Sequence, residues 1–543
     1  MGAGADALTR VSEGDAPAAV QSETGRSRAD STWLILVVGG VLAVGIGLRL
    51  FARSDLWADE ALSVNIARLP LSELRPALRH DGAPPLYYLL LHFWITVFGT
   101  GDFSARALSG VLGIATLVPM WFAGRRLDRR RAAAGLQGPD ARPVAWAALL
   151  LFASSPFAIR YATEARMYAL LILLVVLGYL AVLRSLDRPS WGRLLVVALV
   201  AGLLVYTHYW SFALLVVVGA WLVACAVRGD PARRRAAWST VVAIGLGCVT
   251  FLAWLPTFWF QVVHTGTPWG SPIGPVASVA EAFKSFGGNT HAAGWALLLV
   301  ALLAVFARAV DANHFEVDLR TRPGVRVEAG IGLAVLGLGL AMSRLSGTTF
   351  EGRYAAVMFP LFLLSAAFGL TVFASRPVRY AVMVVLIVLG FWGGASNALR
   401  NRTQAFQVAD VLSAQARPDD LVVYCPDAIG TDVARLAPDG LREVGFPDMT
   451  RSSRIDWADY ARRVDEADPE QFARRLLRRA GPEAQVWLVY TDGEARMTEQ
   501  CSRIADTLAL LRPERTRVIE PDPYFFEHHG LYRYPAETPA PSS

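Results

Sequence analysis

Long apolar runs alternate with short polar segments along most of the chain. The runs fall at about residues 32–52, 84–98, 103–123, 143–159, 167–184, 192–207, 210–227, 237–258, 291–308, 327–343, 354–374 and 378–397. A helix needs roughly 20 predominantly apolar residues to cross the hydrocarbon core of a bilayer, and most of these runs approach that length. The pattern therefore predicts a polytopic α-helical membrane protein.

One run does not fit a full crossing. The segment 84–98 is only about 15 residues long, opens with Pro84-Pro85 and contains His92. Dense arginine marks cytoplasmic loops, and it occurs here at 125–131, 184–193, 228–235, 308–326 and 376–379. These loops share one side with the amino terminus only if 84–98 lies in the outer interface. We therefore expect about 11 spans, with residues 53–102 forming a first outer loop that contains juxtamembrane helices.

The composition changes after Asn397, where the long apolar runs end. Short apolar strands at Leu421–Tyr424 and Gln485–Tyr490 alternate with arginine-rich amphipathic stretches at 457–479 and 498–512. Alternating strands and helices predict an α/β domain, and no glycine-rich phosphate loop follows either strand. The sequence therefore predicts four parts: a disordered cytoplasmic tail (1–31), a transmembrane domain (32–397), an extracytoplasmic α/β domain (398–535) and a disordered tail (536–543).

Composition supports this organisation and excludes a nucleic-acid partner. The chain is 54% apolar with a mean hydropathy of +0.37, and its net charge of +6 comes from arginines in short loops, since Lys284 is its single lysine. Such arginines set membrane topology, whereas nucleic-acid binding needs a clustered basic face. We expect a multi-pass protein of the plasma membrane. Cys425 and Cys501 both lie in the predicted outer domain, where they could pair, and the sequence leaves that open.

Two adjacent carboxylates follow the first predicted span, in Leu56-Trp57-Ala58-Asp59-Glu60-Ala61. Ionisable groups near hydrocarbon are costly without a partner or a purpose. The alternative is that Asp59 merely caps the helix that follows. About twenty residues further on, His80 and Asp81 precede Pro84-Pro85-Leu86-Tyr87-Tyr88.

This ordered set of motifs, continued by Phe98-Gly99 and by Asp102-Phe103-Ser104-Ala105-Arg106, resembles the GT-C membrane glycosyltransferases. Within them it is most similar to the dolichyl-phosphate-mannose protein mannosyltransferase superfamily, which includes bacterial aminoarabinose transferases. The resemblance covers about residues 32–185. It implies a sugar donor on polyprenyl phosphate, with mannose favoured, and transfer with inversion at the outer face. It also implies that Asp59 is the catalytic base and that Glu60 is the second acid of the pair.

The chemistry of such a transfer needs one base and a cationic clamp. A carboxylate can take the proton of an acceptor hydroxyl, and the departing lipid phosphate needs only a positive charge to stabilise it. The candidate clamp residue in Thr163–Leu170 is Arg166, which matches the family's Ala-Arg-x-Tyr-Ala-Leu together with Tyr168. A second candidate is Arg353. The remaining donor-binding candidates are His208, Tyr209, Asp81 and His80.

Each clamp candidate has a plainer interpretation. Arg166 can pair with Glu164 or extend to the membrane interface, Arg353 can anchor a span, and His208 and Tyr209 can belong to an aromatic belt. Asp59, Glu60, Asp81 and His208 could gather around a divalent metal, but no ligand spacing demands one, so we favour an enzyme without metal or cofactor.

Two rival classes remain, a transporter or flippase of a lipid-linked glycan and a non-enzymatic membrane protein. Transporters usually show internal repeats and ionisable residues at the midplane. Here no convincing repeat is found, and the polar candidates gather at one face. We therefore favour an enzyme whose acceptor is a glycan, a lipid or a protein.

Overall fold

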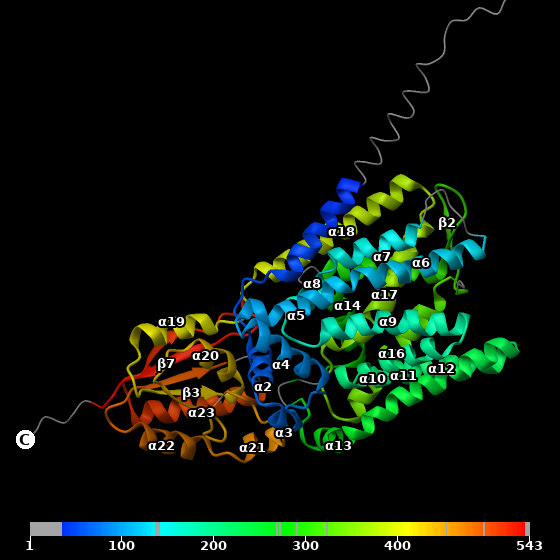
Figure 1. Cartoon of the computed structure of the whole chain (residues 1–543). Coiled ribbons are helices and arrows are strands. Elements are labelled where there is room, and N and C mark those ends of the chain that lie inside the picture. Colours follow the sequence, from blue (N-terminus) through cyan, green and yellow to red (C-terminus); the bar gives the residue numbers. More distant parts are fainter. Residues whose placement is uncertain are drawn as a thin grey trace, which may run out of the picture.

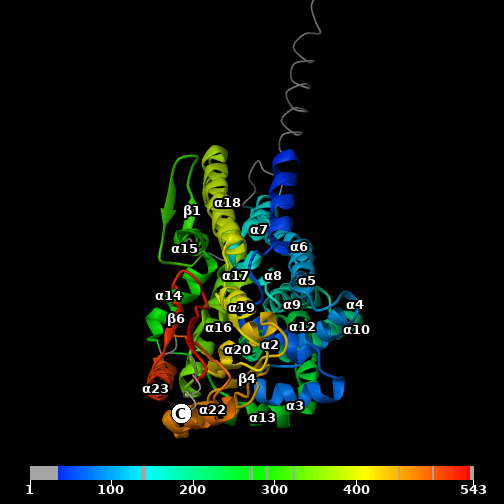
Figure 2. The same ribbon diagram turned by 90° about the vertical axis from the view of Figure 1, so that its left-hand side faces the viewer.

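The computed structural model describes residues 35–537 apart from short gaps at 136–141, 268–269, 271–272, 289–290, 322–323, 452 and 492–494. The predicted tail at 1–31, and the tail at 536–543 beyond its first two residues, lie outside the described residues. Figures 1 and 2 show a bundle of long helices with a smaller α/β domain at one end. The chain is thus a polytopic helical membrane protein with a C-terminal sheet domain.

Six helices in the described part of the chain are long and apolar enough to cross a membrane. Four of them are single elements: α9 (Tyr168–Asp187), α11 (Ser211–Arg228), α16 (Arg326–Leu345) and α18 (Arg376–Leu399). A fifth, Asp102–Ala133, consists of α5 (Asp102–Ala115) followed by α6 (Leu117–Ala133). The sixth, Pro231–Ala253, begins with α12 (Pro231–Val249). Two bent pairs raise the number of candidate spans to eight. The first joins α7 (Pro143–Ser154) to α8 (Pro156–Ala162) at 53°, and the second joins α14 (Pro275–Phe286) to α15 (His291–Phe306).

Four further apolar helices are shorter, and one of them is the segment predicted to lie in the interface. They are Ile35–Leu50, α4 (Leu86–Phe98), α10 (Trp191–Thr207) and Phe359–Val372, which begins with α17 (Phe359–Gly369). Thirteen residues give α4 a length of about 20 Å, well short of a bilayer core of about 30 Å. Eleven spans would require the other three to cross, and that number stays a prediction.

Much of the segment 259–290 is helical. It contains the end of α13 (Leu255–His264) and the whole of α14. Pro256 and Pro275 stand in the first turns of these helices, where a missing N–H costs nothing. In the arginine-rich segment 308–326, two short strands pair antiparallel, β1 (Ala307–Ala309) and β2 (Phe315–Val317).

The C-terminal domain is a five-stranded mixed sheet in the order β4-β3-β5-β7-β6. Its strands are β3 (Leu421–Cys425), β4 (Arg442–Gly445), β5 (Val486–Tyr490), β6 (Thr516–Ile519) and β7 (Gly530–Tyr534). The strands β4, β3 and β5 are parallel, with Val422 opposite both Glu443 and Trp487, while β7 and β6 run antiparallel. The predicted α/β domain is confirmed, and β3 and β5 match the two expected strands.

Helices cover both faces of this sheet (Figure 1). Along β3 the side chains alternate between two clusters, Val422 and Tyr424 facing one and Leu421 and Val423 the other. The helices are α19 (Ala405–Gln415), α20 (Gly430–Leu436), α21 (Tyr460–Glu466), α22 (Pro469–Ala480) and α23 (Ala495–Leu511). The single helix expected at 457–479 is divided before Pro469, where Asp468 caps α22. A disulfide joins Cys425 to Cys501.

Between the bundle and the sheet domain lie the helices of the segment 53–102 (Figure 1), α2 (Ala58–Ala67), α3 (Leu71–Asp81) and α4. Asp59 and Glu60 therefore stand at the junction of the two parts of the molecule.

Candidate active site

The acidic pair occupies the first turn of α2, which begins at Ala58. The N-cap residue is Trp57, and no side chain of the cap accepts a backbone N–H. Asp59 is therefore not the cap of this helix, contrary to the plainer interpretation of the motif. Since successive helical residues are about 100° apart, Asp59 and Glu60 point in different directions and meet different partners.

Asp59 faces two arginines that the sequence places far from it. Its Oδ2 accepts a hydrogen bond from Arg353 Nη1 at 2.9 Å and lies 3.5 Å from Arg166 Nη2. Arg353 comes from the 3-10 helix η2 (Gly352–Val357), and Arg166 from the turn between α8 and α9. The side chain of Asp59 is 25% exposed, against 12% for Arg166 and 16% for Arg353. Its other oxygen has no hydrogen-bond partner among the described residues.

Glu60, in contrast, is fully enclosed. Its carboxylate receives Arg106 Nε at 2.8 Å, Arg106 Nη2 at 2.6 Å and the backbone N–H of Ala165 at 2.8 Å. The side chain is 0% exposed. This geometry ties α2 to α5 and to the turn that carries Arg166, which favours a positioning role. The assignment of Glu60 as a catalytic residue stays an untested prediction.

The turn carrying Arg166 is held by further ion pairs. Glu164 is buried, with Arg160 Nε at 3.1 Å and Arg402 Nη1 at 3.6 Å. Arg402 also donates to the backbone oxygen and the hydroxyl of Thr163. The Glu164 side chain thus pairs with Arg160 and Arg402. The Arg166 side chain contacts Asp59 and donates to the Ser63 hydroxyl at 3.2 Å.

Aromatic rings surround the arginine pair. The His208 ring lies between Tyr168 and Tyr354, 5.7 Å from each by ring centroids. The Arg353 guanidinium lies 5.9 Å from the Tyr354 ring and 6.0 Å from that of Trp57. Tyr168, His208 and Arg353 are therefore brought together as predicted neighbours of one site.

Three N–H groups at this site are buried without an acceptor among the described residues: Trp57 Nε1, Arg166 Nε and Arg353 Nε. Buried donors are nearly always paired in native proteins, so each unpaired one needs an explanation. Two guanidinium groups with unpaired Nε donors, next to an unpaired indole N–H, are suited to an anionic ligand.

Asp81 lies at the same junction, at the end of α3. The Tyr88 hydroxyl donates to its Oδ2 at 2.8 Å. Burial raises the pKa of Asp81 to about 6, against the opposing effects of Arg166 and of the Tyr88 hydrogen bond. This carboxyl group therefore changes charge near neutral pH.

Two predicted site residues lie apart from the arginines. His80 bonds Asp456 of the C-terminal domain at 2.8 Å, at an exposed position. The Tyr209 hydroxyl bonds Gln261 and receives Trp254 Nε1 at 3.1 Å. Each of these contacts joins two elements of the fold, and neither side chain contacts Asp59.

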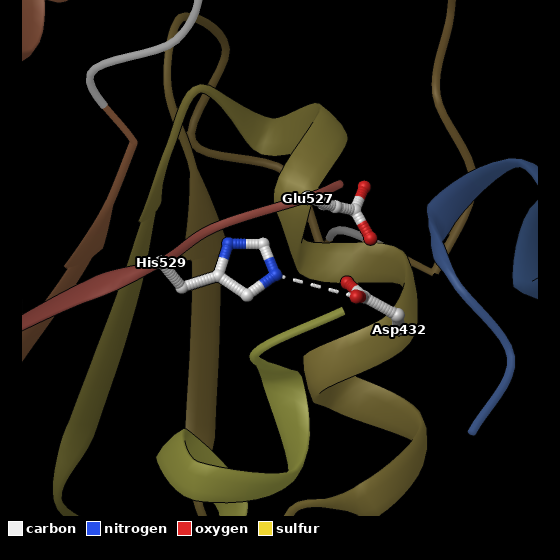
Figure 3. Close-up of side chains that lie close together, drawn as sticks. All are labelled: Asp432, Glu527 and His529. Atoms are coloured by element: carbon white, nitrogen blue, oxygen red, sulfur yellow. Dashed lines mark hydrogen bonds and ion pairs between the residues drawn. The ribbon is translucent and has the colours of Figure 1, made fainter. Parts of the chain in front are cut away.

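The C-terminal domain reaches the start of α2 through a buried cluster (Figure 3). The Ala58 N–H donates to Glu527 Oε2 at 3.0 Å, and the Thr431 hydroxyl donates to the Ala58 oxygen at 3.2 Å. Behind Glu527, Asp432 lies 3.3 Å from His529 Nε2 and accepts the Thr403 hydroxyl at 2.6 Å. Residues of the sheet domain therefore fix the backbone immediately before Asp59.

Two carboxyl groups meet in this cluster, and their pKa values shift in opposite directions. Burial and the neighbouring Asp432 raise the pKa of Glu527 well above its ordinary value. Burial opposes ionisation of Asp432 as well, yet its contacts with His529 and Thr403 lower the pKa of this group. Of the two carboxyl groups, Glu527 is therefore the one that holds a proton more readily and Asp432 the one that ionises more readily.

Asp432, Glu527 and His529 are also the group that could hold a metal, since their ligand atoms lie within 4.8 Å of one another. The same atoms are satisfied by protein partners, because Glu527 accepts the Ala58 N–H and Asp432 accepts Thr403. We therefore derive no chemical step through a metal.

Several residues of the site were not among the sequence candidates. Arg106 stands in a motif that contributed to the family resemblance, and Trp57 precedes the acidic pair, so both had a local signal. Glu527 and Asp432 had none, because their relevance depends on how the sheet domain docks.

Comparison with solved structures identifies the fold. ArnT from Cupriavidus metallidurans in the apo state matches with a TM-score of 0.54 and 14% identity, over 94% of this chain and 100% of ArnT. Over most of its length the chain is structurally similar to GT-C glycosyltransferases, as the sequence motifs predicted. At this identity the likeness establishes the fold.

Two other structures match with lower scores. ArnT from Cupriavidus metallidurans bound to undecaprenyl phosphate gives a TM-score of 0.44 at 15% identity, over 94% of this chain and 100% of that one. The S. cerevisiae protein O-mannosyltransferase Pmt1-Pmt2 complex bound to the sugar donor gives 0.31 at 15% identity, over 46% and 36%. No protein-family model and no curated protein sequence matches the chain.

Proposed function

We propose that the protein is an inverting glycosyltransferase that moves a sugar from a polyprenyl-phosphate carrier to an acceptor hydroxyl. Asp59 is the general base, and Arg166 and Arg353 bind the donor phosphate. The observation that carries this proposal is what surrounds the partly exposed carboxylate of Asp59. Two guanidinium groups, each with a buried Nε–H that has no partner among the described residues, lie beside it together with the similarly unpaired Nε1–H of Trp57.

The ion pairs around Asp59 explain how a phosphate would enter. Arginine presents a planar set of donors that matches phosphate oxygens, and Arg166 and Arg353 at present share Asp59. A donor phosphate competes for the same groups and supplies acceptors for their unpaired Nε donors. Asp59 is then released to accept a proton.

The reaction balances with these residues alone. The acceptor oxygen attacks the anomeric carbon from the face opposite the phosphate, while its proton passes to Asp59. The bond between the anomeric carbon and the phosphate oxygen breaks, and the electron pair leaves with the phosphate. Arg166 and Arg353 stabilise the charge that develops there. Attack from the opposite face inverts the anomeric carbon.

The outer face is the proposed side of the reaction. The segments dense in arginine lie at the far ends of helices such as α6 and α9, away from the sheet domain (Figure 1), and cytoplasmic loops carry such an excess. The disulfide between Cys425 and Cys501 supports the same orientation, because disulfides persist in oxidising compartments. Eleven spans, with the amino terminus inside, complete this proposal.

Mannose is the sugar that the family resemblance favours, and the acceptor is a glycan, a lipid or a protein. A donor screen tests both the class and the sugar. We would supply purified protein in lipid nanodiscs with polyprenyl-phosphate mannose, arabinose and glucose, and measure the release of polyprenyl phosphate.

The matched variants are Asp59→Asn and Glu73→Gln, the latter removing an exposed carboxylate from α3 in the same outer segment. We expect Asp59→Asn to lower the transfer rate by about 10²–10⁴-fold, the usual contribution of a general base. Binding of polyprenyl phosphate should persist, because the two arginines remain. Glu73→Gln should match the unmodified protein. A rate for Asp59→Asn close to that of Glu73→Gln would refute the assignment.

A further inference from the structure

A second site lies at the opposite end of the helical bundle from Asp59. A cavity of about 490 Å³ opens there between α6, α9, α10, α11, α12 and α16. This volume falls within the roughly 300–1,000 Å³ of typical ligand pockets. Most of its wall is aliphatic, with Val182, Leu186, Val197 and Val218 among the lining residues.

The mouth of this cavity is strongly basic. Five arginines line it, Arg126, Arg129, Arg130, Arg233 and Arg326, against two carboxylates, Asp187 and Glu328.

The two carboxylates are already paired within the protein. Arg126 contacts Asp187, and Arg130 Nη1 lies 2.9 Å from Glu328 Oε1, which also accepts the Tyr179 hydroxyl at 2.8 Å. The guanidinium groups of Arg129, Arg233 and Arg326, which come from α6, α12 and α16, have no partner in the described part of the chain. Three positive charges therefore remain uncompensated at the mouth of an apolar cavity.

The depth of the cavity matches one leaflet of a membrane. Its lining on α9 extends from Val175 to Asp187, a helical length of about 18 Å. One leaflet contributes about 15 Å of hydrocarbon, half of a core of about 30 Å. An acyl chain can thus occupy the aliphatic part while its headgroup lies among the arginines.

We propose that this cavity binds an anionic glycerophospholipid, with its phosphate on Arg129, Arg233 and Arg326 and an acyl chain between α9, α10 and α11. Basic pockets between membrane helices bind anionic headgroups in this way. The site differs from the donor site, because the 20 residues of α9 separate Arg166 from Asp187 by about 30 Å. The inference does not depend on the proposed transfer reaction.

Lipid titration followed by native mass spectrometry tests the proposal. The full-length protein would be titrated with phosphatidylglycerol, with zwitterionic phosphatidylcholine and with polyprenyl phosphate. The pocket variant combines Arg129→Ala, Arg233→Ala and Arg326→Ala. The control variant combines Arg188→Ala, Arg235→Ala and Arg320→Ala, which removes three exposed arginines from the same end of the bundle without changing the cavity lining.

We expect the pocket variant to bind phosphatidylglycerol about 100-fold more weakly, the effect of three juxtamembrane charges, and the control variant to bind it normally. Val218→Trp fills the cavity without changing charge and should also displace the lipid. Equal weakening in both triple variants, or equal binding of phosphatidylcholine, would overturn the proposal. So would tighter binding of polyprenyl phosphate that is lost in the pocket variant, since it would assign the cavity to another lipid.

Discussion

Replacement of Glu60 by alanine separates a positioning role from a catalytic one. In the structure the Glu60 carboxylate is 0% exposed and the Arg106 side chain only 7% exposed. Removing one partner of a buried ion pair leaves an uncompensated charge and costs about 3–5 kcal/mol. The Ala165 N–H also loses its acceptor, a further cost of about 1–3 kcal/mol that adds only in part, because the groups are in contact. We therefore expect Glu60→Ala to lower the free energy of unfolding by at least about 3 kcal/mol.

A loss of that size is a large fraction of the roughly 5–15 kcal/mol that stabilises a folded protein. Unfolding in mixed micelles at increasing concentrations of a denaturing detergent measures this loss of free energy. Transfer activity would be recorded on the same samples at detergent concentrations below the unfolding transition. Glu60→Gln should be less damaging, because its amide oxygen still accepts the Ala165 N–H while only the charge on Arg106 is left unmatched.

The exposed Glu73→Gln variant is the control for removal of a carboxylate from the neighbouring helix α3, and its free energy of unfolding should match that of the unmodified protein. Glu60 is not a positioning residue if the free energy of unfolding of Glu60→Ala lies within about 1 kcal/mol of that of the unmodified protein while the transfer rate falls by more than 100-fold. In that case Glu60 would act on the substrate directly.

Three further predictions concern the junction and the sheet domain. Because its environment raises the pKa of Glu527, a neutral glutamine should replace it well: Glu527→Gln should preserve the transfer rate and Glu527→Ala should reduce it. Equal loss of the transfer rate in both variants would indicate an ionised or metal-bound glutamate. The fold raises the pKa of Asp81 from 3.8 to about 6, so the protonated carboxyl group stabilises the folded state. Its contribution to the free energy of unfolding should be complete below about pH 4 and should be lost as the pH rises through 6. If its carboxylate form is required, kcat/KM should rise over the same interval, and Asp81→Asn should remove that limb from the pH profile. Replacing Cys425 and Cys501 by serine should destabilise the sheet domain by about 4 kcal/mol, measured by its rate of proteolysis.

The membrane architecture was accessible from the sequence because hydrocarbon imposes a simple rule on composition. The short run at 84–98 became α4, whose 13 residues are too few to cross, as its length and its Pro84-Pro85 start indicated.

The site was accessible in part. Asp59, Arg166 and Arg353 were candidates because each stands beside a predicted span, and the structure brings them together across 294 residues of chain. Asp59 and Glu60 have different partners and different exposure because helical geometry points them in different directions once α2 begins at Ala58. The sequence did not indicate where that helix starts, because no side chain of its own caps it.

The cap comes instead from the other end of the chain, and this changes what the C-terminal domain can be. Glu527 accepts the N–H of Ala58 and Thr431 donates to its oxygen, while Arg435 bonds Asp102, whose carboxylate accepts the Leu56 N–H. A domain that served only as an outer cover would not need to hold both backbone groups of the residue before Asp59. Since an error of about 1 Å in the position of a catalytic group can cost 100-fold in rate, the sheet domain is part of the structure that places Asp59 against Arg166 and Arg353. Changes to its buried cluster should therefore alter transfer without touching donor or acceptor.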